Sequence, residues 1–199
     1  MFRELWGVVQ RRYPTTGGRL FFLLVCLIIA IVIGGALVIG GAAGLAWTDT
    51  EKFCIGCHEM RDNSYAEFKD TIHDHNRVGV RASCPDCHVP REVLPLLYRK
   101  MEASLEVWGH IKGSIDTKEK FEKERATMAQ REWVRFKKSD SLACRNCHKF
   151  DAMDSALQSE RAQARHKKAQ AEHITCIDCH FGIAHSEPEG PGPQEIKIK

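Results

Sequence analysis

The chain has 199 residues, of which 43% are hydrophobic and 28% are charged, and its formal net charge is +3. This length suits one membrane segment followed by one modest domain. The small net charge, with no basic stripe interleaved with aromatic residues, argues against a nucleic-acid partner.

The first predicted element is a membrane-spanning helix. Residues 1–19 are basic, with a single acid at Glu4, and residues 20–48 contain no charged residue. At about 1.5 Å per residue this stretch makes roughly 40 Å of helix, more than the hydrocarbon core of about 30 Å requires. We therefore predict an uncleaved signal anchor that crosses the bacterial inner membrane once. The arginines place residues 1–19 in the cytoplasm and the rest of the chain in the periplasm.

Two alternatives bear on this segment. A cleaved signal peptide is one, because Gly44-Leu45-Ala46 resembles a cleavage site, but the apolar region of a signal peptide spans only about 7–15 residues. The other concerns association. Ala36, Gly40 and Gly44 follow one another at four-residue spacing, a pattern that packs membrane helices together, so a homodimer could form.

Four copies of the pentapeptide C-x-x-C-H follow, beginning at Cys54, Cys84, Cys144 and Cys176. This is the attachment motif of a c-type haem, in which two thiols form thioethers and the His binds the iron. Zinc also binds C-x-x-C pairs, but it gives no reason for a His after every second Cys. We therefore predict four covalently bound haems. The attachment residues are Cys54, Cys57, Cys84, Cys87, Cys144, Cys147, Cys176 and Cys179, and the motif histidines are His58, His88, His148 and His180.

The fold predicted around these motifs is mainly α, with little or no β structure. Few long apolar stretches occur after residue 48, so the porphyrins themselves should form much of the core of the domain. Eight of the nine cysteines belong to the motifs, which leaves none for a disulfide framework. Cys54 comes six residues after Thr48, so the first haem must lie at the membrane surface.

The motifs fall into two pairs, whose first cysteines are 30 and 32 residues apart. His73 precedes Cys84 by 11 residues and His166 precedes Cys176 by 10, which indicates an internal duplication. We divide the periplasmic domain, residues 49–185, into two-haem units at 49–95 and 139–185, joined by a helical segment at 96–138. Residues 186–199 are rich in Pro and Gly and are predicted to be a disordered tail.

Each low-spin iron needs a second axial ligand. Six histidines lie outside the motifs: His73, His75, His110, His166, His173 and His185. We favour His73 and His166 for their repeated position, and His185 because it could bind a haem attached only a few residues earlier. His75 and His173 fit the surface better. Met60 is a further candidate, because a thioether can bind the iron of cytochromes c.

These motifs, with Cys-Ile-Gly-Cys-His-Glu-Met at 54–60, Cys-Pro-Asp-Cys-His-Val-Pro at 84–90 and Gly-Ile-Ala-His at 182–185, resemble the NapC/NirT family of membrane-anchored tetrahaem quinol dehydrogenases. The resemblance covers nearly the whole chain. It implies oxidation of menaquinol or ubiquinol at the first haem and electron transfer to a periplasmic reductase, with nitrate reductase the first choice, or to a soluble cytochrome. The alternative is a haem-bearing anchor or relay subunit of another periplasmic reductase, for nitrite or trimethylamine N-oxide, without quinol oxidation of its own. A terminal reductase is not expected.

The resemblance also implies roles for individual residues. In relatives with C-x-x-C-H-x-M the Met can replace the motif His, so His58 and Met60 both stay candidates for the first iron. Lys100 and Glu106 match by spacing a Lys and an acid near the quinol pocket. Some relatives carry a ligand His shortly after the second motif, where this chain has Arg91 and Val93, so the sixth ligand of the second haem stays open.

Overall fold

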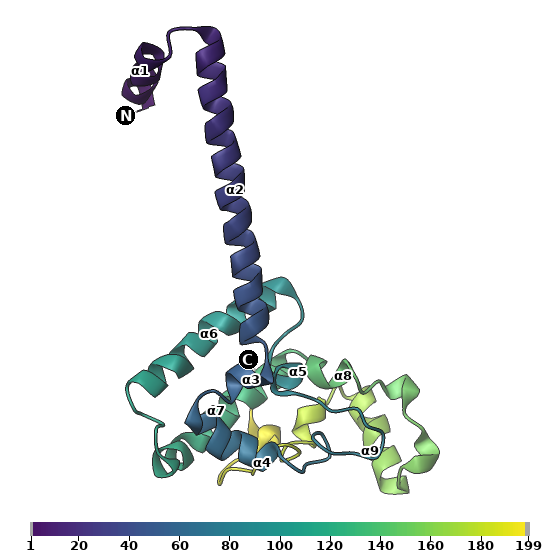
Figure 1. Ribbon diagram of the computed structural model, residues 1–199. Helices are drawn as coiled ribbons and strands as arrows, with labels where there is room; N and C mark the ends of the chain where they lie inside the picture. Colours follow the sequence, from purple (N-terminus) through teal and green to yellow (C-terminus); the bar gives the residue numbers. More distant parts are fainter. Residues whose placement is uncertain (1, 198–199) are drawn as a thin grey trace. The chain divides into compact units, whose positions relative to one another are not determined.

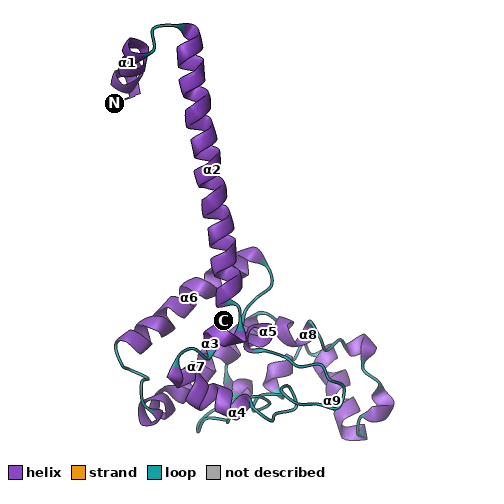
Figure 2. Cartoon of the chain, viewed as in Figure 1, coloured by secondary structure: helices purple, strands orange, loops and turns teal. Residues whose placement is uncertain are grey.

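The computed structural model describes residues 2–197, and for Phe2, Leu5 and Trp6 only the backbone. Its helices are joined by loops, as Figure 2 shows. Of the residues, 67% are helical, and no strand occurs in the described part of the chain. The prediction of a mainly α protein is therefore confirmed. The chain forms two compact units, Met1–Thr48 and Asp49–Lys199.

The first unit consists of helix α1, Phe2–Arg12, and helix α2, Thr16–Thr48 (Figure 1). Arg19 fixes the turn between them, since its guanidinium donates hydrogen bonds to the carbonyl oxygens of Tyr13 and Pro14. Helix α2 has 33 residues, none of them buried, and is long and apolar enough to cross a membrane. This agrees with the predicted membrane segment.

The second unit is a series of short helices around two longer ones, α6 and α7 (Figure 1). The α-helices are α3 (Glu51–Cys54), α4 (Ala66–Phe68), α5 (Cys84–His88), α6 (Val93–Ile111), α7 (Lys118–Lys138), α8 (Leu142–Arg145) and α9 (Glu160–Ala171). A π-helix, η1, spans Met60–Tyr65, and 3-10 turns occur at η2 (Phe150–Ala152), η3 (Ser155–Leu157), η4 (Cys176–Asp178) and η5 (Pro193–Glu195).

The apolar core of this second unit is small. Among the described side chains, the buried hydrophobic residues are Phe68, Phe121, Trp133 and Ile177. Trp133 packs edge-on against Phe181 with ring centres 5.9 Å apart. So small a core gives limited stabilisation by itself, in keeping with the prediction that bound haem fills much of the interior.

The C-terminal segment differs from the predicted disordered tail. Within residues 186–197, η5 forms and Pro193 is fully buried. The ammonium group of Lys137 on α7 donates hydrogen bonds to the carbonyl oxygens of Pro193 and Ile196, both at 2.8 Å. This segment, rich in Pro and Gly, is therefore held in place by a lysine that is distant in the sequence.

Candidate haem-binding sites

Each C-x-x-C-H motif begins in or at the end of a short helix. Cys54 ends α3, Cys84 begins α5, Cys144 lies in α8 and Cys176 begins η4. One helical turn suits this motif, because it brings both cysteines and the following His close together.

The second and fourth motifs each begin with a capping box. The carboxylate of Asp86 accepts hydrogen bonds from the backbone and hydroxyl of Ser83, at 2.8 and 2.6 Å. Asp178 and Thr175 repeat this arrangement at 2.9 and 2.7 Å. The Asp within each C-x-D-C-H therefore begins its own helical turn by satisfying the backbone donors at its start, which supports an internal duplication.

Successive motifs are neighbours in space. A hydrogen bond between the side chains of Cys54 and Cys84 lowers the pKa of Cys54 to about 7 and raises the pKa of Cys84. Helix α5 in turn contacts α8. Burial, together with the nearby thiols of Cys176 and Cys87, raises the pKa of Cys144 to about 11. The four attachment sites thus form one continuous series.

Every motif histidine faces a second histidine. The ring centres are 6.1 Å apart for His58 with His110, for His88 with His185 and for His148 with His73, and 6.0 Å apart for His180 with His166. An imidazole nitrogen binds a metal ion at about 2.0 Å, so two nitrogens on opposite sides lie about 4 Å apart and their ring centres about 6 Å apart. The four pairs therefore fit an iron held between two imidazoles.

Three of these histidines are oriented through Nδ1. Nδ1 of His110 lies 2.5 Å from a carboxylate oxygen of Glu59. Nδ1 of His88 lies 3.2 Å from a carboxylate oxygen of Glu132, and Nδ1 of His166 lies 2.8 Å from the amide oxygen of Gln158. A proton on Nδ1 leaves the lone pair on Nε2, the atom required for an axial ligand. Burial alone would raise the pKa of Glu132, but the bond with His88 and the cations Arg135 and Arg99 lower it to about 2.

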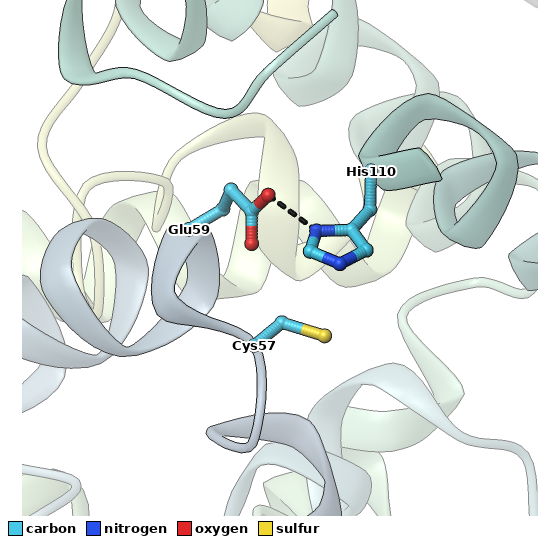
Figure 3. A group of neighbouring side chains, drawn as sticks. All are labelled: Cys57, Glu59 and His110. Carbon is cyan, nitrogen blue, oxygen red and sulfur yellow. Dashed lines mark hydrogen bonds and ion pairs between the residues drawn. The ribbon is translucent and has the colours of Figure 1, made fainter. Parts of the chain in front are cut away.

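Figure 3 shows the surroundings of the first motif. The carboxylate of Glu59, only 2% exposed, points toward His110, and one of its oxygens also lies 3.6 Å from Nε2 of His58. Burial would raise the pKa of Glu59, but the hydrogen bond from His110 lowers it. Ligand atoms of Cys57, Glu59 and His110 lie within 4.8 Å of one another. Because Cys57 belongs to an attachment motif, a haem explains this group better than a separate metal ion.

The histidine pairs in the structure differ in several details from the ligands favoured from sequence. His110 was not among the favoured ligands, yet it faces His58. From sequence we expect His185 to serve the haem attached beside it, whereas in the structure its ring faces His88 of the second motif. His73 precedes the second motif but faces His148 of the third, so the duplication in sequence is not kept in the pairing.

The remaining candidate ligands lie outside the four pairs. The side chain of His75 is 72% exposed and forms an ion pair with Asp74 at 2.6 Å. His173 lines a surface pocket with Phe150. Met60 is the first residue of η1 and is 41% exposed.

The two residues predicted for a quinol pocket both lie on α6 but have different ion-pair partners. Lys100 pairs with Asp49. Glu106 lies 3.2 Å from the guanidinium of the buried Arg99 and is itself half exposed. A half-exposed carboxylate remains accessible to a substrate, whereas the Lys100 ammonium is tied to the residue that directly follows α2.

A helical domain with repeated C-x-x-C-H motifs, each placing its His opposite another, defines the class of c-type cytochromes, which bind haem covalently. The family model for the NapC/NirT cytochrome c family, N-terminal region, matches residues 18–190. The chain therefore belongs to this family, as the resemblance in sequence predicted, and its long apolar helix agrees with a membrane-anchored protein.

Characterised relatives support the assignment. The chain is 53% identical over 168 residues to the denitrification system component NirT of Stutzerimonas stutzeri, covering 79% of this chain and 84% of the relative. It is 50% identical over 186 residues to the cytochrome c-type protein NapC of Escherichia coli K12, covering 92% of each. The match to TorC of the same organism, at 43% identity, covers 94% of this chain but 47% of the relative. No solved structure matches the chain.

Proposed function

We propose that the protein is a tetrahaem cytochrome that oxidises quinol at the periplasmic surface of the inner membrane and passes electrons to a periplasmic reductase in anaerobic respiration. The observation that carries this proposal is the pairing of all four motif histidines with a second histidine. With two protein ligands at every site, no open position is left for a substrate to bind iron. This arrangement suits an electron carrier and not a terminal reductase.

The chain's own residues hold the haems. The motif cysteines would form the thioethers, the four histidine pairs would hold the irons, and Glu59, Glu132 and Gln158 orient three of those imidazoles. When bound, a c-type haem supplies a centre that carries one electron at a time. Because successive motifs are neighbours, the domain offers a continuous route from the first motif to the fourth.

The donor site follows from the place of the first motif. Cys54 lies six residues after the last residue of α2, within reach of a lipid-soluble quinol. Quinol releases protons with its electrons, so the site needs a proton acceptor. The carboxylate of Glu106 can take such a proton, and the ammonium group of Lys100 can donate a hydrogen bond to a quinol oxygen.

The acceptor is a periplasmic reductase or a soluble cytochrome. Nitrate reductase is our first choice of acceptor from the family resemblance. Because one relative is named as a denitrification system component, the reductases of denitrification are further candidate acceptors. A relay or anchor subunit that does not oxidise quinol itself is the alternative function.

A direct test uses the purified full-length protein in detergent with a reduced quinol analogue, following haem absorbance by stopped flow. We expect rapid reduction that an inhibitor of quinol sites abolishes. Full haem content with no reduction by either menaquinol or ubiquinol analogues would support the alternative and contradict the proposal.

The substitution Glu106→Gln tests the proton acceptor. We expect this variant to keep its haem content and lose quinol oxidation, because an amide cannot take up the proton. Glu102→Gln is the matched control, since Glu102 lies one turn away on α6 and also pairs with an arginine, Arg135, at 3.4 Å. Equal quinol turnover in the two variants would remove Glu106 from the mechanism.

A further inference from the structure

Helix α6 exposes an apolar stripe. At 100° per residue, six of its large apolar residues fall within an arc of about 100°. Their exposed fractions range from 40% for Leu97 to 78% for Leu94. The stripe consists of Leu94, Leu97, Tyr98, Met101, Leu105 and Trp108. A continuous exposed surface of this kind marks a site of interaction.

The opposite face of α6 is polar and points into the domain. Arg99 is buried and lies 3.6 Å from Glu132 of α7, while Glu102 lies 3.4 Å from Arg135 of the same helix. A surface helix of a soluble domain normally buries its apolar face and exposes its polar face. Helix α6 does the reverse, because its outer face is apolar and exposed among the described residues.

The chain also restricts what can cover this face. Asp49, the ion-pair partner of Lys100, is bonded directly to Thr48, the last residue of α2. The middle of α6 is therefore held next to the point where the chain leaves its membrane-spanning helix. Any surface at that point lies at the level of the lipid headgroups.

We propose that α6 lies in the outer leaflet interface and inserts its apolar stripe into the bilayer. Such helices lie in the plane of the membrane with the apolar face about 5–10 Å deep. Tyr98 and Trp108 suit this depth, because their rings combine an apolar body with a polar atom. The haem domain would then have a second, non-covalent attachment to the membrane besides α2. This inference does not depend on quinol oxidation.

Labelling kinetics of single cysteines test the insertion. Leu105→Cys is made in a Cys26→Ser background, and the full-length holoprotein is placed in nanodiscs of phosphatidylethanolamine and phosphatidylglycerol. We expect a water-soluble maleimide to react roughly tenfold or more slowly than with Leu157→Cys, because a thiol in apolar surroundings forms little thiolate. Leu157 is the matched control, as it is an 81% exposed leucine on η3.

Equal rates at the two positions would overturn the proposal and would leave the stripe free to bind a protein partner. A second measurement uses the unmodified protein in nanodiscs that contain a phospholipid with a photoactivatable acyl chain. Cross-links to residues 94–108, found by mass spectrometry, are expected in addition to those in α2. Cross-links confined to α2 would overturn the insertion even if the cysteine variants failed to mature.

Discussion

Glu59 illustrates how single residues organise the first motif. It stands between the two alternative ligands in the sequence, His58 and Met60, and its buried carboxylate accepts a hydrogen bond from Nδ1 of His110. A carboxylate on Nδ1 fixes the tautomer of an imidazole and makes its other nitrogen a better ligand. We therefore favour His110 with His58, and not Met60, as the axial pair of the first haem.

The substitution His110→Ala tests this assignment. Loss of one axial imidazole leaves a five-coordinate iron, so we expect one haem equivalent to change from low spin to high spin. Electron paramagnetic resonance and optical absorbance of the oxidised protein measure the change. The control is His75→Ala, which removes an exposed histidine outside the pairs. A spin change in Met60→Ala, with none in His110→Ala, would contradict the assignment.

At this scale the sequence predicts the attachment residues, because the chemistry of a C-x-x-C-H motif lies within five consecutive residues. It does not indicate which histidines face the motif histidines, since that depends on which segments meet in space. His110 follows Glu106 by four residues, one helical turn, in the segment predicted to be helical, and nothing in its sequence neighbourhood marks it as a ligand. One signal in the sequence could have pointed to a fourth partner: four motifs need four partner histidines, whereas we favour only three of the six histidines outside the motifs.

At the scale of elements, α7 connects the fourth motif with the C-terminal segment. The ammonium group of Lys137 lies 2.7 Å from Asp178 in the capping box of η4, and both side chains are largely buried. The same ammonium holds the carbonyl oxygens of Pro193 and Ile196. Composition alone could not predict this order, because the partners are more than 40 residues apart.

The substitution Lys137→Met keeps the apolar stem and removes the charge. It leaves Asp178 without its cation, so we expect the free energy of unfolding to fall by about 3–5 kcal/mol. Residues 186–197 should also become sensitive to limited proteolysis. Lys138→Met, at an exposed neighbouring position, is the control, and equal protease resistance in both variants would count against the role of Lys137.

At the scale of the whole molecule, one carboxylate joins three distant segments. Glu67 of α4 lies 2.6 Å from Arg125 of α7 and accepts a hydrogen bond from the backbone of Ser186 at 3.0 Å. Burial would raise the pKa of Glu67, but the hydrogen bonds from Arg125 and Ser186 lower it. With so few buried apolar side chains, such cross-links carry a larger share of the stability.

We expect Glu67→Gln to lower the free energy of unfolding by about 1–3 kcal/mol near neutral pH. A lowered pKa means that ionised Glu67 stabilises the fold above the ordinary pKa of about 4.5, and that this contribution is lost as the pH falls through the folded-state value. The difference from the natural protein should therefore shrink in denaturant titrations as the pH falls below the ordinary pKa of Glu67, about 4.5. A difference that stays constant with pH would show that the charge is not responsible. Glu122→Gln, which removes a more exposed partner of Arg125, should cost less than about 1 kcal/mol.

The histidine pairing has a consequence for biogenesis. His73 and His166 precede their motif partners along the chain, whereas His110 and His185 follow theirs by 52 and 97 residues. In the proposed orientation the domain is exported from its N-terminal side, so the third and fourth motifs would emerge when their partners are already outside. The first two must wait, and the second waits until almost the entire domain has been translocated. Maturation therefore ends far from where it begins, and the arrival of residue 185 completes the last axial pair.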